Sequence, residues 1–124
     1  MKMKLPKLPV LMRETLGPFE QMVLTAIMTA GNNAYGVPIY DKVCELANKR
    51  VNMGSLYITL DRLERKHLVS SRESDPRYEP RGKPKRFYKV EAEGKRLLEE
   101  SVATGERVAE AFWSLGKWRA KRAK

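Results

Sequence analysis

The hydrophobic residues of this chain recur at helical spacing in three successive segments, and the period changes abruptly after Leu68. Residues 69–72 and 86–90 have the pattern of short strands, and prolines and a glycine interrupt the charged loop between them. From Ala92 to Lys121 the helical pattern returns without a proline. The sequence therefore predicts three helices, one β-hairpin with a long tip, and one long helix, in that order.

The first helical segment is apolar on more than one side. It opens at Pro18, a residue that the first turn of a helix tolerates, and it stops at Gly31. Leu24 and Met28 lie off its main apolar stripe. A helix of this kind is either central or covered by a second chain. We assign Leu24 and Met28 to an interface between two copies.

The second and third helical segments cover about residues 36–47 and 54–66. Leu56, Leu60 and Leu63 share one face of the third helix, so its other side faces outward. Three helices followed by a hairpin are typical of the winged helix-turn-helix, a mainly α fold with a small β-hairpin. In such a fold the third helix enters the major groove of DNA and the hairpin reaches the adjacent backbone.

The charge of the chain also favours a polyanionic partner. Lys and Arg number 25 against 15 Asp and Glu, which gives a net charge of +10. Such an excess is typical of proteins that bind nucleic acid, and less often of those that bind anionic membranes. The longest N-terminal apolar run, residues 8–12, is interrupted by Pro9 and is too short for a signal peptide or a membrane span. We expect double-stranded DNA as the partner, no membrane, and a cytoplasmic location.

Several other classes of site find no support in the sequence. Cys44 and His67 are the single cysteine and histidine, so neither an internal disulfide nor a metal site of usual ligand spacing can form. No nucleophile is paired with a base and an orienting group, and no glycine-rich phosphate loop occurs. We expect no enzyme activity, no metal and no cofactor.

We assign DNA contacts to the outward residues of the third helix and to the basic hairpin loop: Ser55, Tyr57, Ile58, Thr59, Arg62, Lys83, Lys85 and Arg86. Ser55 and Thr59 either bond DNA or only cap and decorate the helix. Tyr57 either contacts DNA or packs against the hairpin. Arg62 either reads guanine, whose O6 and N7 match a guanidinium, or pairs with Glu64 or a phosphate. The three hairpin cations either contact phosphates or only form a solvated basic loop, and we assign them to phosphates.

The last helix would have about 30 residues and a length of about 45 Å, more than a small domain can cover. We therefore predict a homodimer whose interface contains Leu24, Met28, Leu98, Ser101, Gly105, Val108, Phe112 and Trp113. A mid-helix glycine costs about 1 kcal/mol relative to alanine, so Gly105 is expected to have a packing reason. A small hydrophobic effector would bind at this seam beside Met22, Phe112 and Trp113. A closed seam without a ligand is the alternative.

The predicted organisation has three parts. Residues 1–15 form a flexible basic arm, residues 16–91 the winged helix-turn-helix DNA-binding domain, and residues 92–124 a dimerisation helix with a basic tail.

Four motifs resemble the PadR family of bacterial regulators. They are the run from Asn52 to Lys66 with the following Leu-Val, Ala-Tyr-Gly at 34–36, the wing at 82–90, and Glu-Gly at 93–94. The single C-terminal helix is similar to the compact subgroup of that family. The resemblance implies a homodimer, usually a repressor, that is sometimes tuned by a small molecule.

The sequence departs from the family pattern at three places. His67 stands where the family has a glycine after the third helix, at a position that often needs a left-handed backbone. Gly82 is the one glycine left in the wing, which predicts a stiffer and longer tip. Gly105 stands where multidrug-sensing members have an aromatic residue at the dimer centre.

The function predicted from the sequence is a sequence-specific transcriptional regulator, a repressor that binds a palindromic operator as a homodimer. The main alternative is a non-specific or architectural nucleic-acid-binding protein. Only the regulator should prefer its site over random DNA by about a thousandfold or more. A third alternative is a module whose last helix lies in the groove of another protein, and it predicts a folded monomer when the chain is alone.

Overall fold

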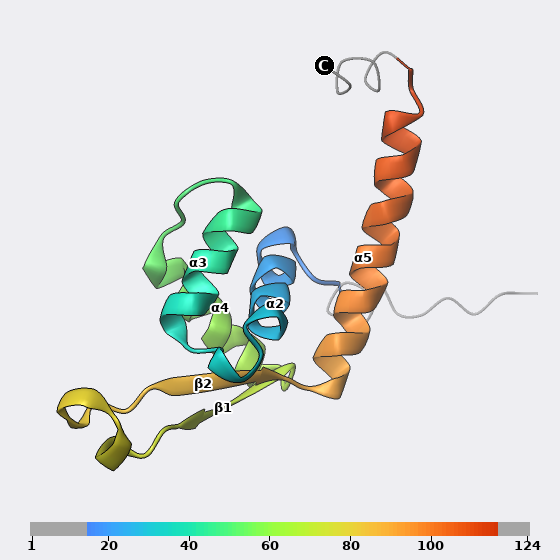
Figure 1. The fold of residues 1–124 in the computed structure, drawn as a ribbon. Coiled ribbons are helices and arrows are strands. Elements are labelled where there is room, and N and C mark those ends of the chain that lie inside the picture. The colour runs from blue at the N-terminus through green and yellow to red at the C-terminus, as the bar shows by residue number, and fades with distance from the viewer. Residues whose placement is uncertain (1–14, 117–124) are drawn as a thin grey trace, which may run out of the picture.

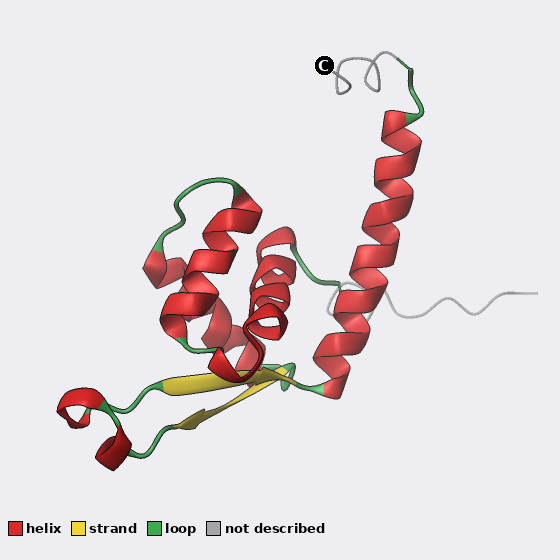
Figure 2. Ribbon diagram, in the orientation of Figure 1, coloured by secondary structure: helices red, strands yellow, loops and turns green. Residues whose placement is uncertain are grey.

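The computed structural model describes residues 15–116 of the chain (Figure 1). The described residues form α2 (Pro18–Ala30), η1 (Gly31–Asn33), α3 (Gly36–Ala47), α4 (Met53–Arg65), β1 (Val69–Glu73), η2 (Pro76–Tyr78), η3 (Pro80–Gly82), β2 (Arg86–Val90) and α5 (Ala92–Trp113), where η marks a short 3-10 helix. The predicted mainly α fold with one small β-hairpin is confirmed (Figure 2). The predicted basic tail after residue 116 and nearly all of the predicted N-terminal arm lie outside the described residues.

The core lies where α2, α3 and α4 meet beside the hairpin (Figure 1). Its largest fully buried side chains are Val23, Leu24, Ile39, Val43, Leu56, Leu60, Leu63 and Val69. The central element is α2, because it contacts α3, α4, β2 and α5.

The assignment of Leu24 to a dimer interface is therefore wrong: its side chain is 0% exposed inside the chain's own core. Met28, one turn later, is 47% exposed.

The hairpin pairs β1 with β2 in antiparallel register, with Val69 opposite Val90 and Arg72 opposite Phe87. Val69 and Val90 are buried, so side chains alternate between a core face and an opposite, outward face. The outer edge of β2 is also held, since the Tyr88 amide donates to the Ala34 carbonyl at 2.8 Å. The wing is thus attached to the segment between α2 and α3 as well as to β1.

The first turns of α5 pack tightly on the domain. A Cβ at Gly94 would collide with the carbonyl oxygen of Leu68, so the helix can approach this closely only with glycine there. Leu97 and Leu98 are 5% and 8% exposed and belong to the core. Leu98 is consequently not open to a second chain, contrary to its assignment to the dimer interface. Beyond these residues α5 rises away from the other helices (Figure 1).

The end of α5 differs from the prediction. The helix has 22 residues and ends at Trp113, not at Lys121. The Ser114 hydroxyl donates to the Ala111 carbonyl at 2.7 Å, and Gly116 has a φ of 61°, a conformation that stops a helix. At 1.5 Å per residue α5 is about 33 Å long. The prediction was too long because it followed the periodic pattern of apolar residues, and that pattern does not report the helix stop at Gly116.

Candidate nucleic-acid interface

The third helix, α4, presents one buried face and one open face. Asn52 caps its start by accepting a hydrogen bond from the Ser55 amide at 3.0 Å. Ser55 and Ile58 are exposed, Ile58 by 60%. Thr59 is 4% exposed, so its assignment to DNA contact is wrong. Thr59 follows Leu56 by three positions, and that spacing places it on the buried face.

Tyr57 lies at the edge of the open face of α4. Its side chain is 48% exposed, and its hydroxyl lies against Gly36 at the start of α3, where a Cβ would collide with it. The glycine of the Ala-Tyr-Gly motif therefore makes room for this ring. The sequence left two alternatives for Tyr57, contact with DNA or packing against the hairpin. In the structure the Tyr57 ring packs, but against α3 and not against the hairpin. About half of the side chain remains exposed and can contact a partner.

Arg62 pairs with a buried carboxylate on α2. Its Nη1 lies 3.8 Å from Glu20 Oε2, and Lys66 Nζ lies 3.1 Å from the same oxygen. The other oxygen of Glu20 accepts the Gly17 amide at 3.0 Å, and the residue is 8% exposed. The predicted alternative partner, Glu64, instead accepts a hydrogen bond from Ser71 at 2.8 Å. Glu20 was missed because its partners are far away in the sequence.

Two of the three predicted wing cations are already paired with carboxylates of the same chain. Lys85 Nζ lies 3.6 Å from Glu79 Oε1 and 4.6 Å from the centre of the Tyr35 ring. Arg86 Nη2 lies 3.1 Å from Glu73 Oε2. Lys85 and Arg86 therefore hold the wing together, which reduces the positive charge that they offer to phosphates.

The tip of the wing carries two further cations that are open to a partner. Lys83 and Arg81 are exposed, and within residues 15–116 neither has an ion pair. Arg77, by contrast, is paired with Asp75 at 2.6 Å, and it holds the pKa of that carboxyl below its ordinary value. Arg81 was missed by the sequence analysis. It has a φ of 60° in the turn before Gly82, and the Pro-Arg-Gly turn was the only sequence signal for it.

Comparison with known proteins shows the family to which the chain belongs. Residues 23–100 match the sequence model of the transcriptional regulator PadR-like family. The chain belongs to this family. Its members are DNA-binding transcriptional regulators, so the resemblance noted from the motifs, the winged helix-turn-helix and a role in DNA-binding regulation are confirmed.

Solved structures similar to this PadR-like chain show the same fold. A PadR family transcription regulator from Clostridium difficile R20291 is 23% identical, with a TM-score of 0.64 over 77% of this chain and 94% of that one. A PadR-like transcription factor from Bacteroides fragilis is 24% identical, with a TM-score of 0.62 over 90% and 100%. BpsR from Bordetella bronchiseptica, whose DNA binding is regulated by 6-hydroxynicotinic acid, is 16% identical, with a TM-score of 0.65 over 96% and 78%.

No curated protein matches the sequence significantly. In the described part of this PadR-like chain, no helix is long and apolar enough to cross a membrane.

Glu20 offers a test of how Arg62 is positioned in this PadR-like chain. Glu20→Gln keeps the shape and can still accept the Gly17 amide, but it removes the charge that holds Arg62 and Lys66. We expect the ratio of operator to random-DNA affinity to fall by about tenfold, because one well-placed guanidinium contact supplies about 1–3 kcal/mol of discrimination. Binding isotherms on both duplexes measure the ratio. Glu99→Gln, the same charge change on the exposed surface of α5, is the control. An equal effect of both variants would show that Glu20 does not position Arg62 for DNA.

The wing tip predicts a specific salt dependence. Replacing Arg81 and Lys83 with alanine should lower the slope of log affinity against log salt by about two, since each lost phosphate contact removes about 0.9. Replacing Lys85 and Arg86 should lower it less, because these two cations face Glu79 and Glu73. Titrations of one duplex at several salt concentrations provide the slopes. Equal slopes for the two double variants would show that the internal pairing does not matter.

Proposed function

We propose that this PadR-like chain is a repressor that binds a palindromic operator as a homodimer. In this proposal the exposed side of α4, with Ser55, Ile58 and Arg62, reads one half-site in the major groove. Arg81 and Lys83 at the wing tip contact adjacent phosphates. The net charge of +10 adds attraction that does not depend on sequence. The direction of regulation, repression, rests on the resemblance to the family.

The observation that carries the proposal is the apolar face of α5 beyond the domain. Val102 is 45% exposed, Val108 62% and Phe112 40%, and helical spacing places them along one side of α5. Leu115, which is 58% exposed, follows the end of the helix. This side continues the stripe that Leu97 and Leu98 bury against the domain. An extended apolar stripe on a soluble domain marks an interaction surface. A second copy of α5 presents the same stripe, which is what a two-fold interface requires.

Gly105 supports a helix as the occupant of that face. In this chain a Cβ at Gly105 would meet nothing within 4 Å, so packing inside one copy does not explain the glycine. Ser101 and Ala109 lie one turn away on the same side. Small residues on one side of a helix allow another helix to approach closely, and that offsets the low helix propensity of glycine. We propose Met28 on α2 as part of the same interface, since its side chain is open.

A dimer of this kind would match the symmetry of DNA. Its two copies of α4 would need to lie about 34–36 Å apart to enter successive major grooves of a palindrome. We further propose that a small hydrophobic effector binds at the seam beside Met22, Phe112 and Trp113 and changes this spacing. Phe112 and Trp113 form an edge-to-face pair with ring centres 4.8 Å apart, which a flat ligand could extend. The regulation of BpsR by 6-hydroxynicotinic acid is a precedent for control of DNA binding by a small molecule in a protein of this fold, although that ligand is a polar acid.

The experiment that tests the proposal compares two affinities at one salt concentration. The full chain is titrated with its preferred duplex and with a scrambled duplex of equal length and composition. A regulator should prefer the former by about a thousandfold or more. A ratio near one would identify the alternative, a non-specific or architectural binder. Sedimentation in parallel should give a dimer at micromolar concentration, whereas a stable monomer would contradict the proposed interface.

A further inference from the structure

Two cations of α4 share the buried carboxylate of Glu20, but only one of them is bonded to it. Lys66 Nζ lies 3.1 Å from Glu20 Oε2, within hydrogen-bond distance, whereas Arg62 Nη1 lies 3.8 Å from the same oxygen, beyond that distance. The second oxygen of Glu20 accepts the Gly17 amide at 3.0 Å. Both oxygens of the carboxylate are therefore hydrogen-bonded without Arg62.

The guanidinium of Arg62 is correspondingly open to a partner. Its side chain is 47% exposed, and in the described part of the chain it donates no hydrogen bond. Arg62 and Lys66 are four positions apart, so they lie on the same side of α4 and reach the same carboxylate. The charge of Glu20 orients the guanidinium, but a hydrogen bond does not hold it there.

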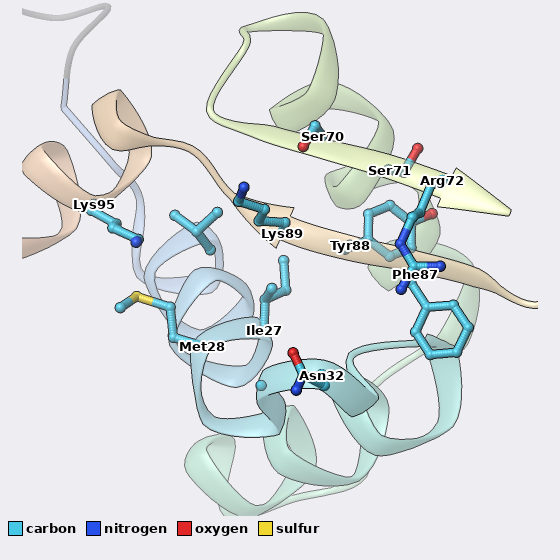
Figure 3. A pocket seen from close by; sticks show the side chains of 12 residues that line it. Ile27, Met28, Asn32, Ser70, Ser71, Arg72, Phe87, Tyr88, Lys89 and Lys95 are labelled. Atoms are coloured by element: carbon cyan, nitrogen blue, oxygen red, sulfur yellow. The ribbon is translucent and has the colours of Figure 1, made fainter. Parts of the chain in front are cut away.

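The acidic residues next to Arg62 on α4 have other partners. Asp61 pairs with Arg65, whose Nη2 lies 3.1 Å from its carboxylate. Glu64 accepts the hydroxyl of Ser71, a residue of β1 (Figure 3), at 2.8 Å. The buried carboxylate on α2 is therefore the group best placed to take the guanidinium away from DNA.

We propose that Lys66 is a positioning residue that keeps Arg62 available to DNA by neutralising Glu20. A buried carboxylate is costly unless a hydrogen-bonded cation lies beside it, and Lys66 meets that requirement. Without Lys66 the only cation left beside the carboxylate would be Arg62, and a guanidinium forms strong charge-assisted hydrogen bonds with a carboxylate. This inference rests on the proposed function, in which Arg62 reads one half-site.

A direct contact between Lys66 and a phosphate is the competing role, since its side chain is 40% exposed. The two roles differ in what they do to sequence preference. A phosphate contact attracts every duplex equally, whereas a residue that acts through Arg62 changes the preference for one sequence over another.

The first part of the test uses the full chain without DNA, so its outcome does not depend on the proposed function. ¹⁵N NMR of the arginine side chains measures rotation about the Nε–Cζ bond of Arg62. Lys66→Met should slow this rotation at least about threefold, because a guanidinium bonded to the buried carboxylate must break that bond to rotate. Lys66→Gln, which keeps a donor but loses the charge, should give a smaller change in the same direction.

Two further variants are the controls of that measurement. Lys66→Arg keeps the charge and should leave the rotation of Arg62 within about twofold of the original rate. Lys95→Met makes the same change on the exposed surface of α5 and should have no effect. Unchanged rotation in both Lys66→Met and Lys66→Gln would overturn the inference even in a chain that binds its operator normally.

The second part of the test measures the ratio of operator to scrambled-duplex affinity. Lys66→Met should lower this ratio by about tenfold, the order of one guanidinium contact with a base. In an Arg62→Ala background the same change should leave the ratio as it is, because no guanidinium remains to be taken up by Glu20. An equal loss on both duplexes, or the same fall in the Arg62→Ala background, would overturn the proposal. A chain without any preferred duplex would instead contradict the proposed function, and the rotation of Arg62 would still decide the role of Lys66.

Discussion

Aspartate at both Val108 and Phe112 is expected to convert the proposed dimer into a monomer. The two side chains are 62% and 40% exposed in one copy, so charges at these positions should be tolerated by the folded subunit. In a dimer they would be buried, and each lost apolar contact is worth about 1.5–3 kcal/mol before the cost of burying a charge is added. Together this weakens association by at least about a hundredfold.

Operator affinity should fall with the dimer, because one copy contacts only a half-site. We expect a loss of at least about a hundredfold, measured by titration of the palindrome alongside sedimentation of the same samples. Ala103→Asp with Ala111→Asp is the matched control, since these residues lie with Glu106 and Glu110 on another side of α5. If the Val108 and Phe112 variant stays dimeric, or if the control dissociates equally, the interface has been placed on the wrong side of the helix.

Leu24→Ala is expected to destabilise each subunit by about 2–5 kcal/mol, the range for a leucine removed from a packed core. The side chain is 0% exposed in the central helix α2, so the cavity would be enclosed. Met28→Ala, one turn later on the same helix, should change the stability of the monomer by only about 0.5 kcal/mol or less, as is usual at surface positions.

Denaturant unfolding of the two variants measures this difference, and it should be made in the Val108 and Phe112 aspartate background. There the expected monomer removes any contribution of association to stability. If Leu24→Ala lowered the free energy of unfolding as little as Met28→Ala does, Leu24 would be a surface residue, and the described core would be contradicted.

The elements themselves followed from local patterns. The strand at 86–90 was predicted with the bounds that β2 has, and the first strand differs only by ending at Glu73. His67, where a left-handed backbone was expected from the family resemblance, has a φ of 64°. These features depend on neighbours in the sequence, and alternation, helical spacing and turn residues report on such neighbours directly.

The errors share a different cause. Whether Leu24 is covered by its own chain or by a second one depends on how α3, α4 and α5 surround α2, and periodicity cannot distinguish these cases. Thr59 is a polar residue on a buried face, which a count of apolar residues assigns to the outside. The partner of Arg62, Glu20, comes from another helix, so only the packing of α2 on α4 brings the two together.

The central claim is that two copies of α4, joined through α5, read the two halves of one DNA site. Selection of binding sites from a random pool by the full chain, followed by sequencing, tests it most directly. The account predicts one enriched motif with two inverted half-sites whose centres lie about 10 base pairs apart, or a multiple of that spacing. A pool that gains affinity without any enriched motif, or a motif without inverted symmetry, would contradict it.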